Sequence, residues 1–445
     1  MVPRPRLILI ALIAGVPLLG VAVGRPEWLA SAVAALALLA TIAGWDAWRG
    51  RGLLGGIEVV MPARLQWVQG RASEFAFGFQ TVARRRPFLL RAAFAMPPGL
   101  DLDRDELEVM LPAAAGRHEL ACSCMPQRRG LFQIEGCYYE TTSPLGLWDV
   151  RSHARQSVEV RVYPNMEKER KQVASLFLRT RHSGAMLTRQ VGQGRDFEKL
   201  REYVPGDGYN TIHWKASARR RHPITKTFQV EKTQEVYVIL DASRLSARLQ
   251  VPGDASRGTH LDRYIAAALV LGLAAEKQGD LFGLVTFSDR VLSFVRARNG
   301  KEHYGACREA LYRLEPQAVS PDYEELATFI RLRLRRRALL IFMTDLDDPV
   351  LMETFQHAVN LICRKHLVLV HMLQPGNIRP LFTRATVSQV DEIYQDLAHH
   401  FAWSDLRQLT LDLRQRGVAL SLLAPDQFSA EATSGYLRVK QRQLL

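Results

Sequence analysis

Two apolar runs without a charged residue open the sequence. The first extends from Leu7 to Val23 and the second from Trp28 to Trp45. Each is about as long as the ~17–25 residues that a helix needs to span a bilayer, and the short stretch between them allows only a tight turn. Residues 1–51 are therefore predicted to form a transmembrane helical hairpin.

Basic residues at the ends of these runs predict the orientation of the hairpin. Arg4 and Arg6 precede the first run and Arg49 and Arg51 follow the second, whereas the turn carries one arginine offset by one glutamate. Because basic residues favour the cytoplasmic side, both soluble domains are expected in the cytoplasm. A cleaved signal peptide over the first run is the alternative, but it would leave the second apolar run unexplained.

Short alternating segments follow the hairpin over residues 52–165. Apolar and polar residues alternate with period two in Glu74–Phe79 and in Val158–Tyr163, as they do in strands that bury one face. Glycine and proline separate such segments, for example at Pro97–Gly99. Several short strands at this spacing predict an immunoglobulin-like β-sandwich, in which we find no catalytic constellation.

Apolar strands and helical segments alternate over residues 235–445. The predicted strands are Val236–Leu240, Leu281–Phe287, Ala338–Met343, His366–His371 and Val418–Leu423. The segment Leu261–Lys277, between the first two, has a helical pattern. Continuous apolar strands between helices indicate a parallel sheet covered on both faces, so a Rossmann-like α/β domain is predicted.

Oxygen-bearing side chains follow two of these strands. Asp241 and Ser243 come after the first strand, and Asp345 comes after the third. Ligands of such sheets bind beyond the carboxyl ends of the strands, and two carboxylates with hydroxyls from Ser243 and Ser320 form a set suited to Mg²⁺. The alternative is that both aspartates cap the helices that follow them.

The net charge of +14 is concentrated between the two soluble domains, over residues 166–234. Met166–Lys232 contains 15 Lys and Arg against 7 Asp and Glu, a net charge of +8. A basic segment of this kind favours an acidic partner, anionic lipid or nucleic acid. Nucleic acid is not expected, because the basic residues are not interleaved with aromatic side chains.

Five residues of this segment form a candidate docking surface. They are Trp214, Lys215, Arg219, Arg220 and Arg221. The three arginines have no acidic neighbours to neutralise them, and tryptophan and arginine are the usual anchors of protein interfaces. Two alternatives stay open: the segment only joins the domains, with Trp214 buried, or the arginines hold anionic lipid near the membrane.

The same segment contains a long motif. Eight residues represent it: Gly194, Phe197, Arg201, Tyr203, Pro205, Gly206, Asp207 and Trp214. The runs Gly192–Asp207 and Ile212–Arg219 closely resemble the signature of the bacterial family catalogued as domain of unknown function 58. Arg129–Gly130 and Ser143–Leu147 also resemble the pattern of that family, and the resemblance extends over the whole chain.

The resemblance implies a last domain similar to von Willebrand factor A domains, which often hold a metal ion through an Asp-x-Ser-x-Ser site. Asp241 and Ser243 match that site, Asp345 matches its distal aspartate, and Ser320 is a loose match for an intervening threonine. The third position is Leu245, which has no oxygen to offer. The resemblance therefore implies a degenerate metal-ion-dependent adhesion site, with Mg²⁺ as its candidate ion.

The resemblance also implies a partner and a location. Proteins of this family commonly accompany MoxR-type AAA+ ATPases, with which they are thought to assemble or mature other proteins. No Gly-x-x-x-x-Gly-Lys-Ser/Thr phosphate loop occurs in the sequence, so nucleotide hydrolysis would come from the partner. The expected location is the bacterial cytoplasmic (inner) membrane, with two spans and both soluble domains in the cytoplasm.

These observations favour a membrane-anchored adaptor without catalytic activity. No serine or cysteine nucleophile motif accompanies His213, the residue that most invites a catalytic role. The alternatives are a metal-assisted hydrolase that uses Asp241, Asp345 and His213, and a structural protein of the cell envelope. The five cysteines are an odd number and are expected to be reduced thiols.

Overall fold

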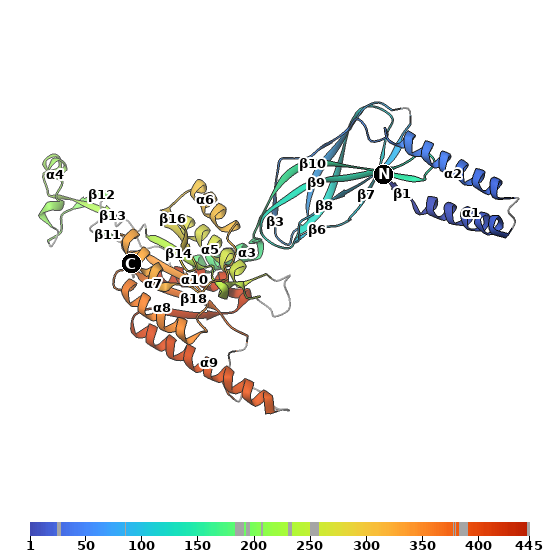
Figure 1. Cartoon of the computed structure of the whole chain (residues 1–445). Coiled ribbons are helices and arrows are strands. Elements are labelled where there is room, and N and C mark those ends of the chain that lie inside the picture. The colour runs from blue at the N-terminus through green and yellow to red at the C-terminus, as the bar shows by residue number, and fades with distance from the viewer. Residues whose placement is uncertain are drawn as a thin grey trace. The chain divides into compact units, whose positions relative to one another are not determined.

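Two compact units make up the chain in the computed structural model. They are Met1–Asn165 and Met166–Leu445 (Figure 1). The structure describes residues 1–24, 28–84, 86–182, 191–192, 196–205, 208–229, 234–249, 258–376, 378, 380–381 and 390–442. All five cysteines lie within these ranges as free thiols, as their odd number predicts.

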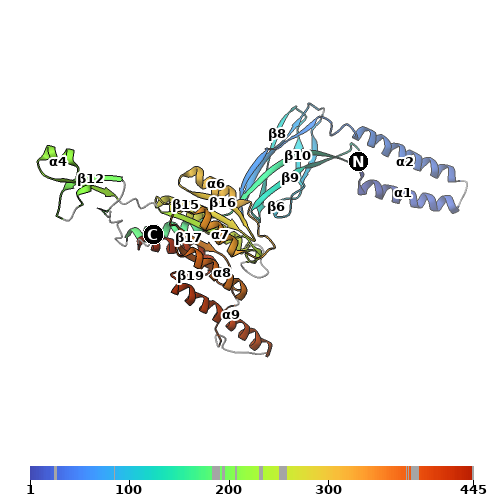
Figure 2. The ribbon, with the colours of Figure 1, turned by 60° about the vertical axis from the view of Figure 1, so that its left-hand side comes forward.

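The first unit begins with two helices that run side by side, α1 (Pro5–Gly24) and α2 (Leu29–Gly50) (Figure 2). Many of their large apolar side chains are exposed: Ile8, Leu9, Ile10, Leu12, Ile13, Val16, Val33, Leu38 and Ile42. Within the described part of the chain, no helix is both long and apolar enough to count as a candidate membrane span. The transmembrane role of the hairpin stays a prediction.

Two sheets follow the hairpin and share one core. The strands are β2 (Ile57–Val60), β3 (Arg64–Val68), β4 (Ser73–Thr81), β5 (Phe88–Phe94), β6 (Leu100–Leu102), β7 (Leu107–Leu111), β8 (Gly116–Pro126), β9 (Gly130–Thr142) and β10 (Trp148–Tyr163). One sheet has the order β1-β10-β9-β5-β7, where β1 is Val2–Pro3 and β3 pairs with β10 in parallel. The other has the order β2-β4-β8-β6.

Aromatic side chains at alternate positions of β4 explain the period of two in the sequence. Phe75, Phe77 and Phe79 are each at most 3% exposed and point into the shared core. Phe77 meets Phe94 edge to face, with ring centroids 4.7 Å apart. Because successive side chains of a strand point to opposite faces, the residues between them remain on the outer side.

A buried aspartate joins the hairpin to the sandwich within this unit. The carboxylate of Asp46, on α2, is fully buried. It accepts hydrogen bonds from Ser143 Oγ at 2.6 Å, from the Leu145 amide at 2.9 Å and from the Leu147 amide at 3.3 Å. The family-like run Ser143–Leu147 therefore wraps around this carboxylate, and Trp148 Nε1 adds a bond to the Ala43 carbonyl at 2.9 Å.

The second unit is built on a six-stranded sheet of the order β16-β15-β14-β17-β18-β19. Its strands are β14 (Glu235–Asp241), β15 (Leu281–Phe287), β16 (Val291–Arg298), β17 (Leu339–Met343), β18 (Leu367–Leu373) and β19 (Ala419–Leu423). Five strands are parallel and lie where the sequence predicts them, whereas β16 is an antiparallel edge strand. Apart from β16, which the sequence pattern missed, the predicted parallel sheet is confirmed.

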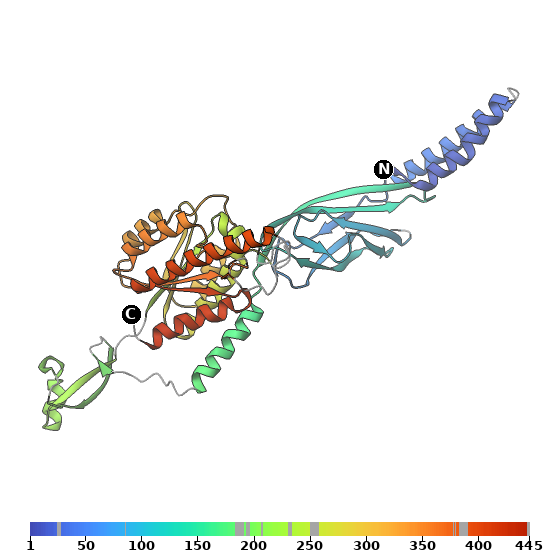
Figure 3. The ribbon, with the colours of Figure 1, turned by 90° about the horizontal axis from the view of Figure 1, so that it is seen from below.

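Helices cover both faces of this sheet. One face carries α3 (Glu167–His182), α5 (His260–Lys277), α6 (Lys301–Tyr312) and α10 (Phe428–Gln441), and α3 runs beside α10 (Figure 3). The other carries α7 (Tyr323–Arg333), α8 (Pro349–Ile362) and α9 (Val390–Gln415). Alternate residues of β14 enter the two cores, Val238 on one side and Ile239 on the other, which is why its sequence is continuously apolar.

The basic segment predicted to connect the domains and to carry the docking surface contains folded structure of its own. A three-stranded antiparallel sheet has the order β11-β13-β12, from β11 (Val191–Gly192), β12 (Asp196–Glu202) and β13 (Ile224–Gln229). A short 3₁₀ helix, η2 (Tyr209–Thr211), and α4 (Trp214–Arg220) lie between β12 and β13. We call the described part of residues 196–229 the signature arm.

Candidate functional site

Two aspartates meet at the carboxyl edge of the parallel sheet. Asp241 ends β14, and Asp345 follows its neighbour β17. The sheet order places this edge where β14 has β15 on one side and β17 on the other, which is the position at which open α/β sheets bind ligands. The side chains are 1% and 2% exposed, respectively.

Protein donors occupy both oxygens of Asp241. The Ser243 amide donates to Oδ1 at 2.8 Å, and the Thr344 hydroxyl donates to Oδ2 at 2.6 Å. Thr344 Oγ1 in turn lies 2.8 Å from the hydroxyl of Tyr323, on α7. The carboxylate is therefore part of a buried hydrogen-bonded chain that extends to a helix on one face of the sheet.

Asp345 has an equivalent set of partners from the opposite face. The Tyr264 hydroxyl donates to Oδ1 at 2.7 Å, and His260 Nδ1 lies 2.8 Å from Oδ2. His260 and Tyr264 are four residues apart on α5, so both point from the same side of that helix. The Tyr264 hydroxyl also accepts from the Leu373 amide at 3.4 Å, which ties the network to the end of β18.

Burial controls the protonation of this network. Removal from water raises the pKa of Asp241 to about 6; its hydrogen bonds with Thr344 and Ser243 oppose this shift, and the nearby Asp345 charge adds to it. Burial also raises the pKa values of Tyr264 and Tyr323 well above their ordinary range. Both phenols therefore stay protonated and can donate to the carboxylates or to Thr344.

The predicted metal ligands fit a cation poorly as they are arranged. Asp241, Ser243 and Asp345 lie together, but Ser320 is exposed and its hydroxyl accepts from Arg244 Nε at 3.2 Å. Leu245 fills the third position of the motif with a buried apolar side chain. Among the described residues, no group of three or more His, Cys, Asp or Glu is placed to hold a metal ion. Binding of Mg²⁺ would have to displace protein donors, and it stays a prediction.

Helix capping does not account for the two aspartates either. Ser243 caps the short 3₁₀ helix η3 (Arg244–Ala247) by accepting from the Leu245 amide, and Asp348, not Asp345, caps α8. The sequence analysis did not single out Thr344, Tyr323, Tyr264 or His260. His260 lies one residue before the predicted helix Leu261–Lys277 and four residues before Tyr264, and this spacing was the one available signal for a shared polar face.

In the signature arm, some residues hold α4 in place. His213 Nδ1 accepts from the Ala216 amide at 3.1 Å and so caps α4. The Ser217 hydroxyl donates to the His213 carbonyl at 3.1 Å and accepts from the Ile224 amide at 2.8 Å, which fastens α4 to β13. Ile212, Ile224 and Thr225 are buried beneath. His213 thus has a structural role as the cap of α4.

Other residues of the arm point outward. Trp214 is 69% exposed and Tyr209 is 77% exposed, so the alternative of a buried Trp214 is wrong. Lys215, Arg219, Arg220 and Arg221 are exposed as well. Arg221 closes α4 with a positive φ of 60°, in the left-handed region that side chains usually avoid. The five residues predicted to bind a partner therefore lie together on α4 and on Arg221, the residue that ends it.

The remaining signature residues have mixed outcomes. Gly194, Gly206 and Asp207 lie outside the described residues, and Phe197 is described only as a backbone position of β12. Arg201 lies on β12 and donates to the Glu202 carbonyl at 3.2 Å. Tyr203 lies next to Tyr209, with ring centroids 6.4 Å apart, and Pro205 is exposed.

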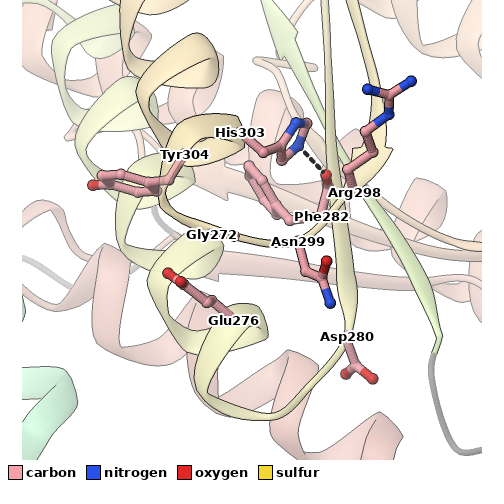
Figure 4. Close-up of a pocket in the computed structure, with 9 residues that line it drawn as sticks. Gly272, Glu276, Asp280, Phe282, Arg298, Asn299, His303 and Tyr304 are labelled. Carbon is pink, nitrogen blue, oxygen red and sulfur yellow. Dashed lines mark hydrogen bonds between the residues drawn. The ribbon is translucent and has the colours of Figure 1, made fainter.

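A small pocket lies at the opposite, amino-terminal edge of the sheet (Figure 4). It is lined by residues from α5, β15, β16 and α6, among them Glu276, Asp280 and His303. Asp280 is held by Lys440 Nζ at 2.7 Å and by the Gln234 amide at 3.1 Å, and His303 Nε2 bonds to the Phe282 carbonyl at 2.7 Å. None of the predicted site residues lines this pocket.

Solved structures similar to the chain include von Willebrand factor A-like proteins. The VWA domain of SpRpn10 is 9% identical with a TM-score of 0.27, over 46% of this chain and 95% of that one. BatB from Bacteroides thetaiotaomicron is 14% identical with a TM-score of 0.30, over 46% and 99%. Proximal thread matrix protein 1 from the mussel byssus is 12% identical with a TM-score of 0.26, and the chain spans less than half of it, 46%. At such TM-scores these likenesses carry no argument about function.

The sequence comparison is more specific. The family described as "Protein of unknown function DUF58" matches residues 199–379, from β12 to beyond β18. The resemblance predicted from the signature is therefore confirmed over this range, and the described residues form a mixed α/β fold. No curated protein is similar enough to the chain to count as a match.

Proposed function

We propose that this protein is a membrane-anchored adaptor that binds an acidic protein partner through the signature arm. One observation carries the proposal: Trp214, a large apolar side chain, is 69% exposed beside a cluster of exposed basic side chains. Exposed tryptophan and arginine on a small folded element are the usual anchors of an interface. The local hydrogen bonds of His213 and Ser217 hold this surface in one conformation before a partner binds.

A binding role fits the chemistry of the chain better than a catalytic one. The buried carboxylates at the sheet edge are saturated by protein donors and closed to solvent. Burial raises the pKa of the Cys307 thiol to about 11 and those of Cys124 and Cys137 to about 12, so these thiols are poor nucleophiles at neutral pH. We therefore favour the adaptor over a metal-assisted hydrolase.

The partner that we propose is a MoxR-type AAA+ ATPase. The family resemblance supports it, and so does the lack of a phosphate loop in this chain, which leaves nucleotide hydrolysis to another protein. An acidic patch on the ATPase would complement the four basic side chains around Trp214. The adaptor would then present client proteins to the ATPase for assembly or maturation.

The anchor that we propose is the hairpin of α1 and α2, inserted in the bacterial inner membrane with the β-sandwich and the second unit in the cytoplasm. Apolar side chains are exposed along both helices, and no charged residue occurs within the two apolar runs. Trp45 and Trp48, which are exposed near the end of α2, have the amphipathic rings that favour the membrane interface. The flanking arginines support the cytoplasmic orientation of both ends.

Binding to the purified ATPase tests the adaptor function. We expect the full chain in detergent to capture a MoxR-type ATPase from the same organism, and Trp214→Ala to weaken capture by about 30-fold, the loss of about 2 kcal/mol that a central anchor gives. Charge reversal at Arg219 and Arg220 should slow association and make it less sensitive to salt.

Leu332→Asp is the matched control, because Leu332 is 72% exposed on α7 and lies outside the arm. It should leave capture unchanged. Equal capture by the wild-type chain and the Trp214→Ala variant would show that the arm does not bind the ATPase. Failure of the wild-type chain to capture it would remove the ATPase as the partner.

A further inference from the structure

The amino-terminal half of α9 carries an exposed apolar stripe. Val390 is 66% exposed, Ile393 53%, Tyr394 67%, Leu397 36% and Phe401 58%. Their spacing of three and four residues places them on one side of the helix, over about 16 Å at the rise of an α-helix. We call these five residues the α9 stripe.

The stripe is on the side of α9 that its own domain does not use. The buried residues of this helix, Leu406, Leu409 and Leu413, all belong to its carboxyl-terminal half and pack into the core beneath the sheet. At 100° per residue they lie on a different face from the stripe. Figure 1 shows the amino-terminal half of α9 extending past the other helices of its layer.

The stripe lies in an acidic stretch of sequence. Asp391, Glu392, Asp396 and Asp405 are the charged residues from Val390 to Leu406, and that range contains no lysine or arginine. An apolar stripe of this length on a solvent-exposed helix face is typical of a helix that binds another chain. The charge around it selects a basic occupant.

The chain itself contains an occupant of that chemistry. The signature arm exposes Tyr209, Trp214, Val204 and Leu200, which are apolar or aromatic, beside Lys215 and the three arginines. Apolar anchors beside basic side chains on the arm match an apolar stripe in an acidic stretch of α9. Both halves of a head-to-tail contact are therefore present in every copy.

We propose that the signature arm of one copy binds the α9 stripe of a second copy. The inference rests on the proposed function, because it names a second copy as an additional partner of the same arm. A membrane anchor would favour this contact by confining the copies to one plane, which raises their effective concentration. An arm that is held by a second copy is closed to the ATPase, so self-association restrains docking.

Mixing two complementary variants tests the contact. The first has a disabled arm and an intact stripe, Trp214→Ala with Arg220→Glu. The second has a disabled stripe and an intact arm, Leu397→Asp with Phe401→Asp. All four positions are exposed, Leu397 least at 36%, so both variants should fold, and circular dichroism checks this.

The masses of the full chains, measured by light scattering in detergent, give a distinct pattern for a head-to-tail contact. The wild-type chain should associate, each variant alone should be monomeric, and the equimolar mixture should form dimers. Leu332→Asp should associate as the wild type does, because Leu332 is exposed outside both surfaces. Because the contact pairs opposite charges, the association of the wild type should weaken as salt increases.

Several results would overturn the proposal. Association of the arm variant alone would indicate contact between two stripes, and association of the stripe variant alone would indicate contact that does not use α9. A monomeric wild-type chain would show that the arm has no partner in a second copy, whether it is free or bound to its own α9.

ATPase capture separates this proposal from the proposed function. If both hold, the stripe variant should capture more ATPase than the wild type, because its arms are free, and the arm variant should capture none. If only self-association holds, the mass pattern appears although no variant captures ATPase. If only the adaptor function holds, the stripe variant and the wild type capture equally and neither associates.

Discussion

At the scale of single residues, Asp241 determines whether the sheet edge is a closed hydrogen-bonded network or a cation site. Its pKa is raised from 3.8 to about 6 by burial. The folded state therefore keeps a proton on this group at pH values where the unfolded chain has lost it. The contribution to the free energy of unfolding is largest below pH 3.8, falls as the pH rises to about 6, and then stays constant.

We expect Asp241→Asn to remove this pH dependence. One unit of pKa corresponds to about 1.4 kcal/mol, so the variant should gain about 2 kcal/mol on the wild type between pH 4 and pH 6. Asp241→Ala should instead lose stability, because it leaves the Ser243 amide and the Thr344 hydroxyl without their acceptor at a cost of about 1–3 kcal/mol each.

Calorimetry of the full chain at both pH values measures these differences in the transition of the second unit. Titration with MgCl₂ is the accompanying test of the cation. A rise in the wild-type melting temperature that Asp241→Asn abolishes would contradict the closed network and support a metal site. We expect MgCl₂ to leave the melting temperature of each protein unchanged.

Asp46 is the residue on which the junction of the hairpin and the sandwich depends. Asp46→Ala removes the acceptor of three donors in the Ser143–Leu147 loop, with an expected cost of about 3 kcal/mol or more. Hydrogen exchange of the Leu145 and Leu147 amides should become faster. Asp101→Ala is the control, because Asp101 is exposed on β6, and it should leave their exchange unchanged. Equal exchange in both variants would show that Asp46 does not hold the loop.

At the scale of elements, α4 depends on two hydrogen bonds and not on the residues that it exposes. Ser217→Ala removes the hydroxyl that links α4 to the Ile224 amide of β13, at an expected cost of about 1–3 kcal/mol for the unpaired amide. Exchange of the Ile224 amide should therefore accelerate. Trp214→Ala should not change it, because Trp214 is largely exposed. Similar acceleration in both variants would mean that Trp214 also supports the fold of the arm.

The regular elements could be predicted from the sequence, because burial imposes a period on them. Continuous apolar strands such as β15 are buried on both faces, and β4 alternates because one of its faces enters the core. The edge strand β16 is only partly buried and carries arginines, so its sequence lacks either pattern. The strands of the signature arm escaped prediction for the same reason, since among its side chains whose burial is described only Ile212, Ile224 and Thr225 are buried.

The candidate site was predictable only in part. Asp241 and Asp345 follow apolar strands, and the parallel sheet brings such positions to one edge. Their partners Tyr264, Tyr323 and Thr344 come from two helices and a strand end, and no spacing in the sequence links them. The sequence alone could not decide between exposure and burial of Trp214, because tryptophan occurs both in protein cores and as an interface anchor.

At the scale of the whole molecule, the anchor places constraints on both units. Trp45, with Arg49 lying 5.0 Å over its ring, and Trp48 mark the end of α2 that would lie at the membrane interface. Asp46 lies between them and binds the sandwich loop directly. If the hairpin spans the membrane, the β-sandwich begins at the membrane surface without an intervening linker.

The side of the membrane on which the units lie can be read from introduced cysteines. The native thiols are poor reporters, because four of the five are buried and Cys363 is partly exposed. In a Cys363→Ser background, Met110→Cys on β7 and Val350→Cys on α8 provide one exposed thiol in each unit, at positions that are 64% and 68% exposed. A maleimide that cannot cross membranes should label neither in intact cells and both after permeabilisation. Labelling of both in intact cells would place the soluble domains outside the cytoplasm. A cytoplasmic ATPase could then not reach the arm, so this result would favour the structural envelope protein.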